Sequence, residues 1–128
     1  ILIYLARKHG GEDWLPTDPA GMAHVMEWLT VGGGEHLLGL ARCRFMKRNG
    51  LTEGFEQAEK IAWKSLDMME SHLKARDWLA ADRATIAEPA CFVYVALAGE
   101  GEIDTSGHPA VTAWMDRVRA LPGFVEAP

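Results

Sequence analysis

Cysteine is scarce in this chain. The two cysteines, Cys43 and Cys91, stand 48 positions apart in apolar, helix-like surroundings. The sequence has no CxxC pair and no Cys/His cluster at metal-ligand spacing, so it predicts neither a zinc site or other metal site nor a redox pair. We expect both side chains to be buried free thiols in a reducing compartment, and hence a cytoplasmic protein.

An excess of positive charge is also missing. The formal net charge is −5 over 128 residues, and the isoelectric point is about 5.5. Nucleic-acid binding requires a basic stripe that can neutralise phosphates. The one basic run, Arg42 to Arg48, is better explained as a helix end whose cations complement the helix dipole. The sequence therefore predicts no nucleic-acid partner.

Long apolar runs are absent as well. The run "ILIYLA" at residues 1–6 is too short to span a bilayer and has no basic region before it, so it predicts neither a membrane helix nor a signal peptide. The first residue is Ile1 and not Met, and the run resembles the end of an element that begins upstream. We expect the chain to be a piece of a longer protein, with no membrane partner.

Alternation of apolar and polar residues, which is typical of half-buried strands, does not extend over a strand length after residue 6. Apolar residues recur instead at helical spacing, and a chain of this length forms one domain. The predicted fold is therefore an all-α helical bundle. The apolar stripes consist of Met22, Val25, Met26, Leu29, Leu37, Leu38, Ala41 and Phe45; of Phe55, Ala58, Ala62, Leu66, Met69 and Leu73; and of Val111, Trp114, Met115 and Val118.

Several residues predict where these helices begin and break. Asp18 before Pro19 is typical of a helix start, and Thr52 can cap the second helix. Glycines at 32–34 are expected to interrupt the first helix, as a kink or a close approach of another backbone. They lack the Lys and Ser/Thr of a phosphate loop. A helix restarting after Gly34 would still offer free N–H groups to an anion, so ligand contact and packing both remain open here.

The segment "TIAE" at Thr85–Glu88 has the pattern of a capping box. In this arrangement the Thr85 hydroxyl accepts from the N–H of Glu88, and the Glu88 carboxylate reaches back to the N–H of Thr85. We expect a structural role for both residues, at the start of a helix that follows a break at residues 77–80.

The histidines are scattered, and no two are four positions apart. His36, beside Glu35, is the candidate for an exposed imidazole that binds or orients a substrate near a cleft. The alternative is an ordinary surface histidine. No nucleophile–base arrangement follows from the spacing of serine, cysteine and histidine, so we assign no catalytic residue to this chain.

The segments "DWLAADRATIAEPACFVYVALAGEGEID" and "HPAVTAWMDRVRALPGF" resemble the helical C-terminal domain of bacterial-type cytosolic glutathione transferases. The resemblance depends on Trp78-Leu79-Ala80, on the box at Thr85–Glu88, and on Trp114 five positions after Pro109. The start "ILIYLARKHGGEDWLPTDP" is similar to the last helix and linker of that family's thioredoxin-like domain. The resemblance implies such a tail at residues 1–9, a linker at 10–20 and the helical domain at 21–128.

The resemblance also implies a function for the full protein. Members of this family attack electrophilic substrates with the glutathione thiolate, glutathione being a co-substrate, and the residues that stabilise the thiolate lie in the missing upstream domain. The helical domain would supply the electrophile pocket and the contacts of a homodimer, in a detoxification role.

The same resemblance suggests where this domain would contact ligands. Val31, Glu35, Leu38 and Arg42 fall at i, i+4, i+7 and i+11, a continuous stripe on a helix. If this face lines the cleft, the aliphatic residues contact substrate, while Glu35 and Arg42 meet glutathione or the partner subunit. A solvated Glu35–Arg42 pair is the alternative.

Three positions depart from the family pattern. Glu88 replaces the commoner Asp, and Pro89 removes an N–H group from the first helical turn. Several bacterial members have Glu followed two positions later by His or Gln; here Glu35 matches, but Leu37 occupies the later position and His36 comes one position early.

A non-catalytic interaction module is the rival interpretation, because a fold alone does not establish chemistry. The residues upstream of Ile1 discriminate between the two. A thioredoxin-like pattern with Tyr, Ser or Cys near its first strand-to-helix turn favours the enzyme, and its absence favours the module.

Overall fold

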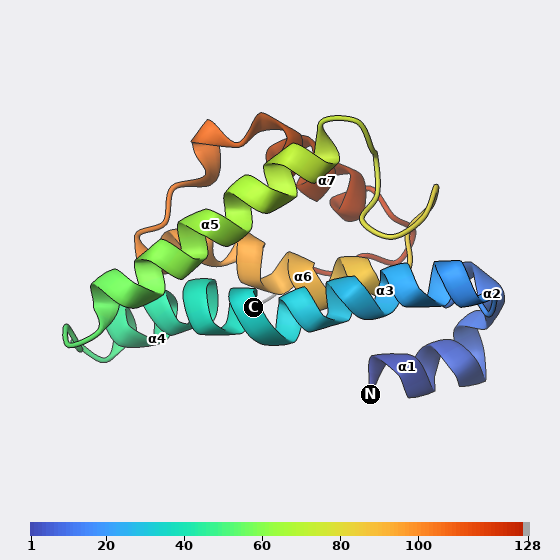
Figure 1. Cartoon of the computed structure of the whole chain (residues 1–128), viewed down its shortest axis with the longest axis horizontal. Helices are drawn as coiled ribbons and strands as arrows, with labels where there is room; N and C mark the ends of the chain where they lie inside the picture. Colours follow the sequence, from blue (N-terminus) through green and yellow to red (C-terminus); the bar gives the residue numbers. More distant parts are fainter. Residues whose placement is uncertain (127–128) are drawn as a thin grey trace.

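The computed structural model describes residues 1–126, which form helices and connecting loops without a strand (Figure 1). The predicted all-α bundle is therefore confirmed, and the opening apolar run is a helix. In chain order the elements are α1 (Leu2–Leu5), the π-helix η1 (Ala6–Gly10), α2 (Gly11–Trp14), α3 (Pro19–Val31), the π-helix η2 (Gly32–Ala41), α4 (Arg42–Arg48), α5 (Phe55–Leu73), α6 (Ala87–Ala96), the 3₁₀ helices η3 (Ala98–Gly101) and η4 (Thr105–Gly107), and α7 (Pro109–Arg119).

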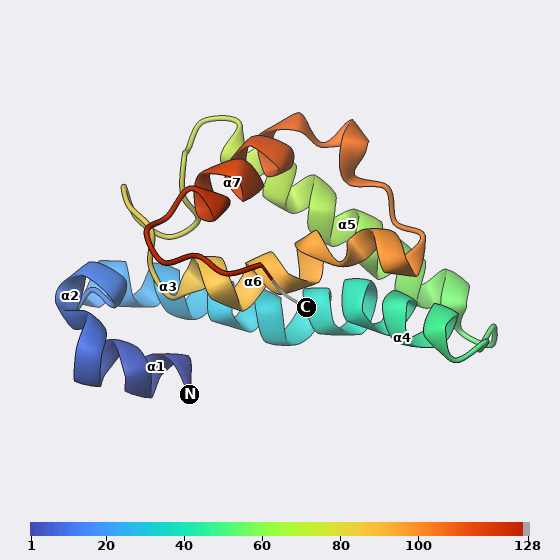
Figure 2. The same cartoon turned by 180° about the vertical axis from the view of Figure 1, so that it is seen from behind.

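The elements α3, η2 and α4 form one uninterrupted helical rod over residues 19–48 (Figures 1 and 2). Asp18 caps its start as predicted, because the Asp18 carboxylate accepts from the N–H of Gly21 at 2.8 Å. The predicted interruption at the glycines is wrong: the N–H of Gly32 bonds the carbonyls of Trp28 and Leu29, so the helical ladder continues. No helix restarts after Gly34, so the free N–H groups that would have allowed an anion to bind there do not arise.

Two glycines of the rod mark places where another helix comes very close. A Cβ on Gly32 would lie 2.7 Å from the carbonyl oxygen of Ala90, and one on Gly39 would lie 2.5 Å from the nitrogen of Ala62. Gly33 and Gly34 have nothing within 4 Å of such an atom. The expected close approach of another backbone is therefore confirmed at Gly32, the first glycine of the run, and a second one occurs at Gly39, outside the run.

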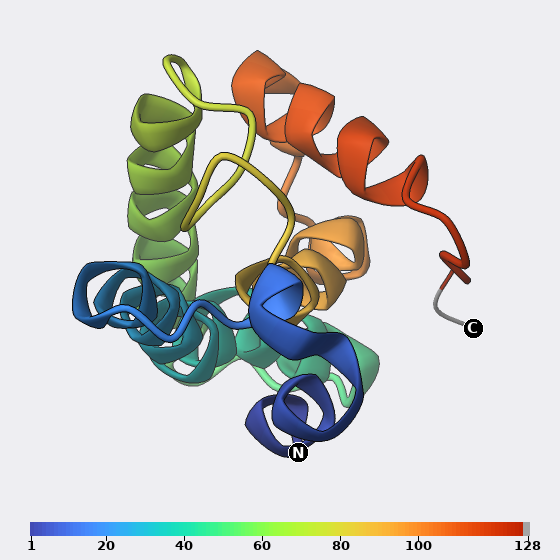
Figure 3. The ribbon, with the colours of Figure 1, turned by 90° about the vertical axis from the view of Figure 1, so that its right-hand side faces the viewer.

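The core is centred on α5 and α6. The apolar stripe of α5 is buried as predicted, with Ala62, Leu66 and Met69 fully inaccessible. Figure 3, viewed along the rod, shows α6 between the rod and α7, with α5 standing to one side. Thr52 does not cap α5, because that helix begins at Phe55 and no side chain bonds its first turn.

The start of α7 is capped by a side chain from another helix. The helix α7 begins at Pro109 after His108, and no side chain within α7 caps it. Glu70 of α5, which is 8% exposed, accepts from the N–H groups of Ala110 and Val111 at 2.9 and 3.1 Å. A carboxylate here also interacts favourably with the positive end of the helix dipole.

The N-terminal segment contains a short helix within the expected linker. Residues 11–14 of the expected linker form α2. The chain changes direction at Gly11, the first residue of α2, where φ is +61°. Leu15 is 2% exposed and packs with Ala6, Val25 and Ile86 in a second, smaller core. Leu15 therefore anchors this segment to the rest of the chain.

The glycine contacts predict opposite effects for two alanine substitutions in the same rod. Gly39→Ala should lower the free energy of unfolding by about 1–3 kcal/mol, because the new methyl group overlaps the backbone of α5. Gly33→Ala, the matched control in open space, should raise that free energy by up to about 1 kcal/mol. Urea unfolding of both variants measures the difference, and equal effects would contradict the close-packing account of Gly39.

Candidate functional site

The predicted ligand-contacting stripe lies on the flank of the rod. Val31 is partly buried against the main core, whereas Glu35, Leu38 and Arg42 are exposed. Within the described residues no ion pair joins Glu35 to Arg42, so the alternative of a solvated pair is not formed in this structure. The four residues thus present an apolar and charged surface that is open to a partner or ligand.

His36 does not belong to that surface. Its side chain is fully buried, and its Nε2 lies 3.1 Å from the sulfur of Met69 on α5, while its Nδ1 has no partner among the described residues. Burial lowers the pKa of His36 to about 4. The expectation of an exposed imidazole is therefore wrong, because His36 falls on the inward face of the rod, where it is a neutral core residue.

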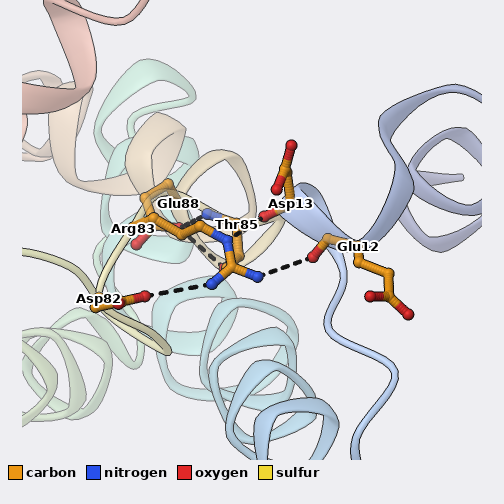
Figure 4. A network of polar contacts seen from close by, with 6 residues as sticks. All are labelled: Glu12, Asp13, Asp82, Arg83, Thr85 and Glu88. Atoms are coloured by element: carbon orange, nitrogen blue, oxygen red, sulfur yellow. Dashed lines mark hydrogen bonds and ion pairs between the residues drawn. The ribbon is translucent and has the colours of Figure 1, made fainter.

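The capping box at Thr85 and Glu88 forms in a modified way (Figure 4). The Glu88 carboxylate accepts from the N–H of Thr85 at 2.6 Å, which confirms the predicted reach back. The Thr85 hydroxyl accepts from the N–H of Ala87 instead of Glu88, at 3.2 Å, and lies 3.1 Å from the carboxylate, to which it donates. The predicted bond from the N–H of Glu88 to the Thr85 hydroxyl is therefore wrong by one position, because the donor is the N–H of Ala87.

Glu88 has a further partner that the sequence pattern does not reveal. Its second carboxylate oxygen accepts from the N–H of Leu79 at 2.8 Å, and the Glu88 side chain is fully buried. Burial raises the pKa of Glu88, while these hydrogen bonds oppose the shift. The carboxylate ties the loop between α5 and α6 to the first turn of α6.

An apolar trough runs along the outer face of α6. One hollow of about 420 Å³ lies between α6 and the C-terminal segment. A second, of about 350 Å³, lies between α6 and α1. Trp14 and Pro89 line both hollows, which makes them neighbouring parts of one surface. Phe92 and Phe124, whose ring centroids are 5.3 Å apart, form the wall on the C-terminal side.

Sequence reasoning missed this trough, although α6 contains a signal for it. Its sequence "AEPACFVYVA" is apolar on nearly all sides, a composition typical of a helix covered all round. In the structure Val93 is nevertheless 37% exposed. Several residues of α1 are exposed too, including Tyr4 at 61%. The uncovered side of α6 is thus continuous with an uncovered side of α1.

Another hollow, of about 610 Å³, lies beside the loop between α5 and α6. It is lined by His24, Glu27 and His72, with charges of both signs on the loop. None of the predicted ligand residues lines it. Its groups do not converge on one ligand chemistry, so the trough is the better candidate site for an apolar molecule.

The chain's own thiols are poor nucleophiles. Burial raises the pKa of Cys91 to about 12 and also raises the pKa of Cys43, so both stay protonated near neutral pH. Among residues 1–126, no cluster of three or more His, Cys, Asp or Glu side chains could hold a metal ion. No helix in this part of the chain is long and apolar enough to cross a membrane.

Substitutions at the capping network should have graded effects on stability. Glu88→Ala should lower the free energy of unfolding by about 3 kcal/mol or more, because it leaves three buried donor groups without an acceptor. Thr85→Ala removes one cap and should cost about 1 kcal/mol. Glu56→Ala, an exposed control, should leave stability nearly unchanged. A Glu88→Ala variant with an unaltered urea midpoint would refute the assignment.

Because His36 is buried in its neutral form, we expect the protein to lose stability in mild acid. The pKa of His36 is lower in the folded state than in the unfolded chain, so the unfolded chain binds the proton more readily. The contribution of the neutral His36 to the free energy of unfolding is fully present above pH 6.5 and is lost as the pH falls toward 4. The total loss is about 3 kcal/mol.

Urea unfolding of wild type and His36→Leu between pH 7 and 4.5 measures this effect. The His36→Leu curve should be flatter with pH, whereas His24→Gln, a change at an exposed histidine, should follow wild type. Parallel curves for wild type and His36→Leu would contradict the prediction.

Comparison with known proteins gives the family. The family model described as "Glutathione S-transferase, C-terminal domain" matches residues 37–122. A disulfide-bond oxidoreductase of Escherichia coli K12, YfcG, is 27% identical over 130 residues, covering 99% of this chain and 60% of that protein.

Solved structures agree with this match. A glutathione S-transferase from Xanthobacter autotrophicus Py2 superposes with a TM-score of 0.91 at 33% identity, over 99% of this chain and 63% of that one. A glutathione transferase family member from Pseudomonas fluorescens Pf-5, crystallised with two glutathione molecules, gives a TM-score of 0.81 at 25% identity, over 94% of this chain and 57% of that one. The chain spans less than two thirds of the length of each of these relatives. Since the family model covers most of its residues, the chain belongs to the glutathione S-transferase family and contains that family's C-terminal domain.

Proposed function

We propose that this chain is the helical part of a glutathione transferase that conjugates the glutathione thiolate to electrophilic substrates. In this proposal residues 1–9 end the last helix of an upstream thioredoxin-like domain, residues 10–20 connect the two domains, and residues 21–128 form the helical domain. The observation that carries the proposal is the uncovered apolar trough, which is continuous with the exposed side of α1. A domain attached ahead of α1 would cover part of this surface and leave the remainder as a cleft.

The chemistry divides between the two parts. Conjugation needs a thiolate, and a thiolate at neutral pH needs a hydrogen-bond donor or a positive field beside the sulfur. This chain's thiols stay protonated and are poor nucleophiles. In this proposal the nucleophile is the glutathione sulfur, and an upstream domain would activate it. The sulfur then forms a bond to the electrophilic carbon of the substrate. In a substitution the leaving group departs with the electron pair of the broken bond, and in an addition to an activated double bond the π electrons move to the neighbouring atom, which takes up a proton.

The trough would hold that substrate. Trp14, Phe92 and Phe124 give it an aromatic lining suited to an apolar or aromatic electrophile. Water is excluded when such a molecule fills the hollow, which favours attack by the thiolate over side reactions. We do not include His36 in this site, because its side chain is buried in the core.

The flank of the rod would serve the second subunit or glutathione. Leu38 is 53% exposed and Phe45 is 59% exposed, and both lie on the rod with Glu35 and Arg42. Large apolar side chains exposed together with charges are typical of a contact surface between subunits. This supports a homodimer in which Val31 and Leu38 give apolar contact.

The Escherichia coli relative favours a second candidate, reduction of disulfide bonds, because that protein is described as a disulfide-bond oxidoreductase. The same glutathione thiolate would then attack one sulfur of the substrate disulfide, the S–S bond would break, and the other sulfur would leave as a thiolate. A second glutathione would resolve the mixed disulfide, so two glutathione molecules are oxidised to glutathione disulfide as the substrate is reduced to two thiols. An interaction module without activity is the third outcome that a test must separate.

The test uses the gene product extended upstream through its natural start. We expect it to conjugate glutathione to a general aromatic electrophile, and we expect the 128-residue chain alone to have no activity. If the protein reduces a small alkyl disulfide and does not conjugate glutathione to the electrophile, the proposed conjugation is wrong and disulfide reduction is the function. Absence of both activities, with no glutathione binding by calorimetry, would overturn the enzyme proposal in favour of the module.

A further inference from the structure

Arg83 joins two parts of the chain that are far apart in sequence (Figure 4). Its Nε donates to the carbonyl oxygen of Asp13 at 3.1 Å, and its Nη2 donates to that of Glu12 at 3.0 Å. Its Nη1 donates to the carboxylate of Asp82 at 3.2 Å, which orients the guanidinium plane. Three donors of one side chain are thus used, two of them on the end of α2.

These contacts complete a row of three consecutive carbonyls. The last carbonyls of a helix have no partner within the helix. Here Glu12 and Asp13 bond Arg83, and the next carbonyl, that of Trp14, accepts from the N–H of Ile86 at 3.0 Å. The C-terminal end of α2 is therefore attached, residue by residue, to the four-residue stretch 83–86 in front of α6.

That stretch is itself fixed in place. Thr85 lies within it and is held by the buried Glu88 carboxylate, which also binds the loop at Leu79. Beneath the contacts, Leu15 fills the small core beside Ile86. The apolar contact fixes where the segment sits, and the directional hydrogen bonds of Arg83 fix its angle.

We propose that Arg83 is a positioning residue that sets the orientation of the segment 1–15, and with it the orientation of whatever part of the protein precedes Ile1, relative to the trough on α6. The planar guanidinium is suited to this role, because it reaches two neighbouring carbonyls at once, whereas a lysine ammonium is a point charge. The effect on catalysis depends on the function proposed above, but the effect on the segment does not.

The first measurement is hydrogen exchange on the protein extended through its natural start. Arg83→Ala should speed exchange of the amides in residues 2–14 about tenfold, and should leave those of the buried part of α5 unchanged. Arg83→Lys should give a smaller increase. Arg48→Ala, which removes an exposed arginine paired with Glu100 at 3.5 Å, is the matched control and should alter neither region.

The second measurement is steady-state kinetics on the same variants. For Arg83→Ala, kcat/KM for the aromatic electrophile should fall about tenfold while KM for glutathione changes less than twofold, because the upstream part would still bind glutathione by itself. Arg83→Lys should recover part of the loss. If kcat/KM falls by the same factor for glutathione and for the aromatic electrophile, the positioning role is contradicted.

The two measurements also separate the two proposals. Unchanged exchange in residues 2–14 of Arg83→Ala, or faster exchange spread evenly over all helices, would overturn the role of Arg83. A wild-type protein without turnover would overturn the proposed function, and the exchange data would still decide the role of Arg83.

Discussion

The structure depends most on one buried carboxylate, that of Glu88. It accepts hydrogen bonds from the N–H groups of Leu79 and Thr85 and from the Thr85 hydroxyl, all in a site without access to water. A buried charge of this kind is costly unless its hydrogen bonds are satisfied, so the loop before α6 has little freedom to take another path. With that loop fixed, Arg83 and Ile86 are placed to bind the end of α2.

A second constraint is the contact between helices at the glycines. Gly39 allows the rod to approach the backbone of α5, and Gly32 allows it to approach α6. Contacts this close exclude any side chain at either position and bring the three helices into one tightly packed core. Both glycines lie within the unbroken rod, and neither one ends the helix.

The sequence predicts the helices of this bundle well and their mutual contacts poorly. The stripe through Ala62 and Leu66 identifies α5, and Asp18 identifies the start of the rod, because periodicity and capping are local properties. Gly39 carries no local sign of its contact with Ala62, and Glu70 carries none of its role at the start of α7. Such roles arise only when distant segments meet.

The candidate site shows the same division. Local pattern correctly identifies the Thr85–Glu88 box, but it fails for His36, because the three- and four-residue spacing does not say which side of the rod faces the core. The trough was missed because its wall residues, including Trp14 and Phe124, come from opposite ends of the chain. The one local indication of the trough is that α6 is apolar on nearly all sides, which is typical of a helix covered all round. Val93 of this helix is nevertheless exposed.

The proposal that an upstream domain covers the α1 side of the trough is tested directly by one substitution in the protein extended through its natural start. Leu5→Glu places a charge beside the hollow between α1 and α6, where Leu5 is 45% exposed, and Met68→Glu places one at a similarly exposed position on α5. If the proposal is correct, Leu5→Glu lowers the melting temperature by several degrees and Met68→Glu changes it little, because only the first charge is buried. Equal, small effects of the two substitutions would show that this side remains open to water and would contradict the account.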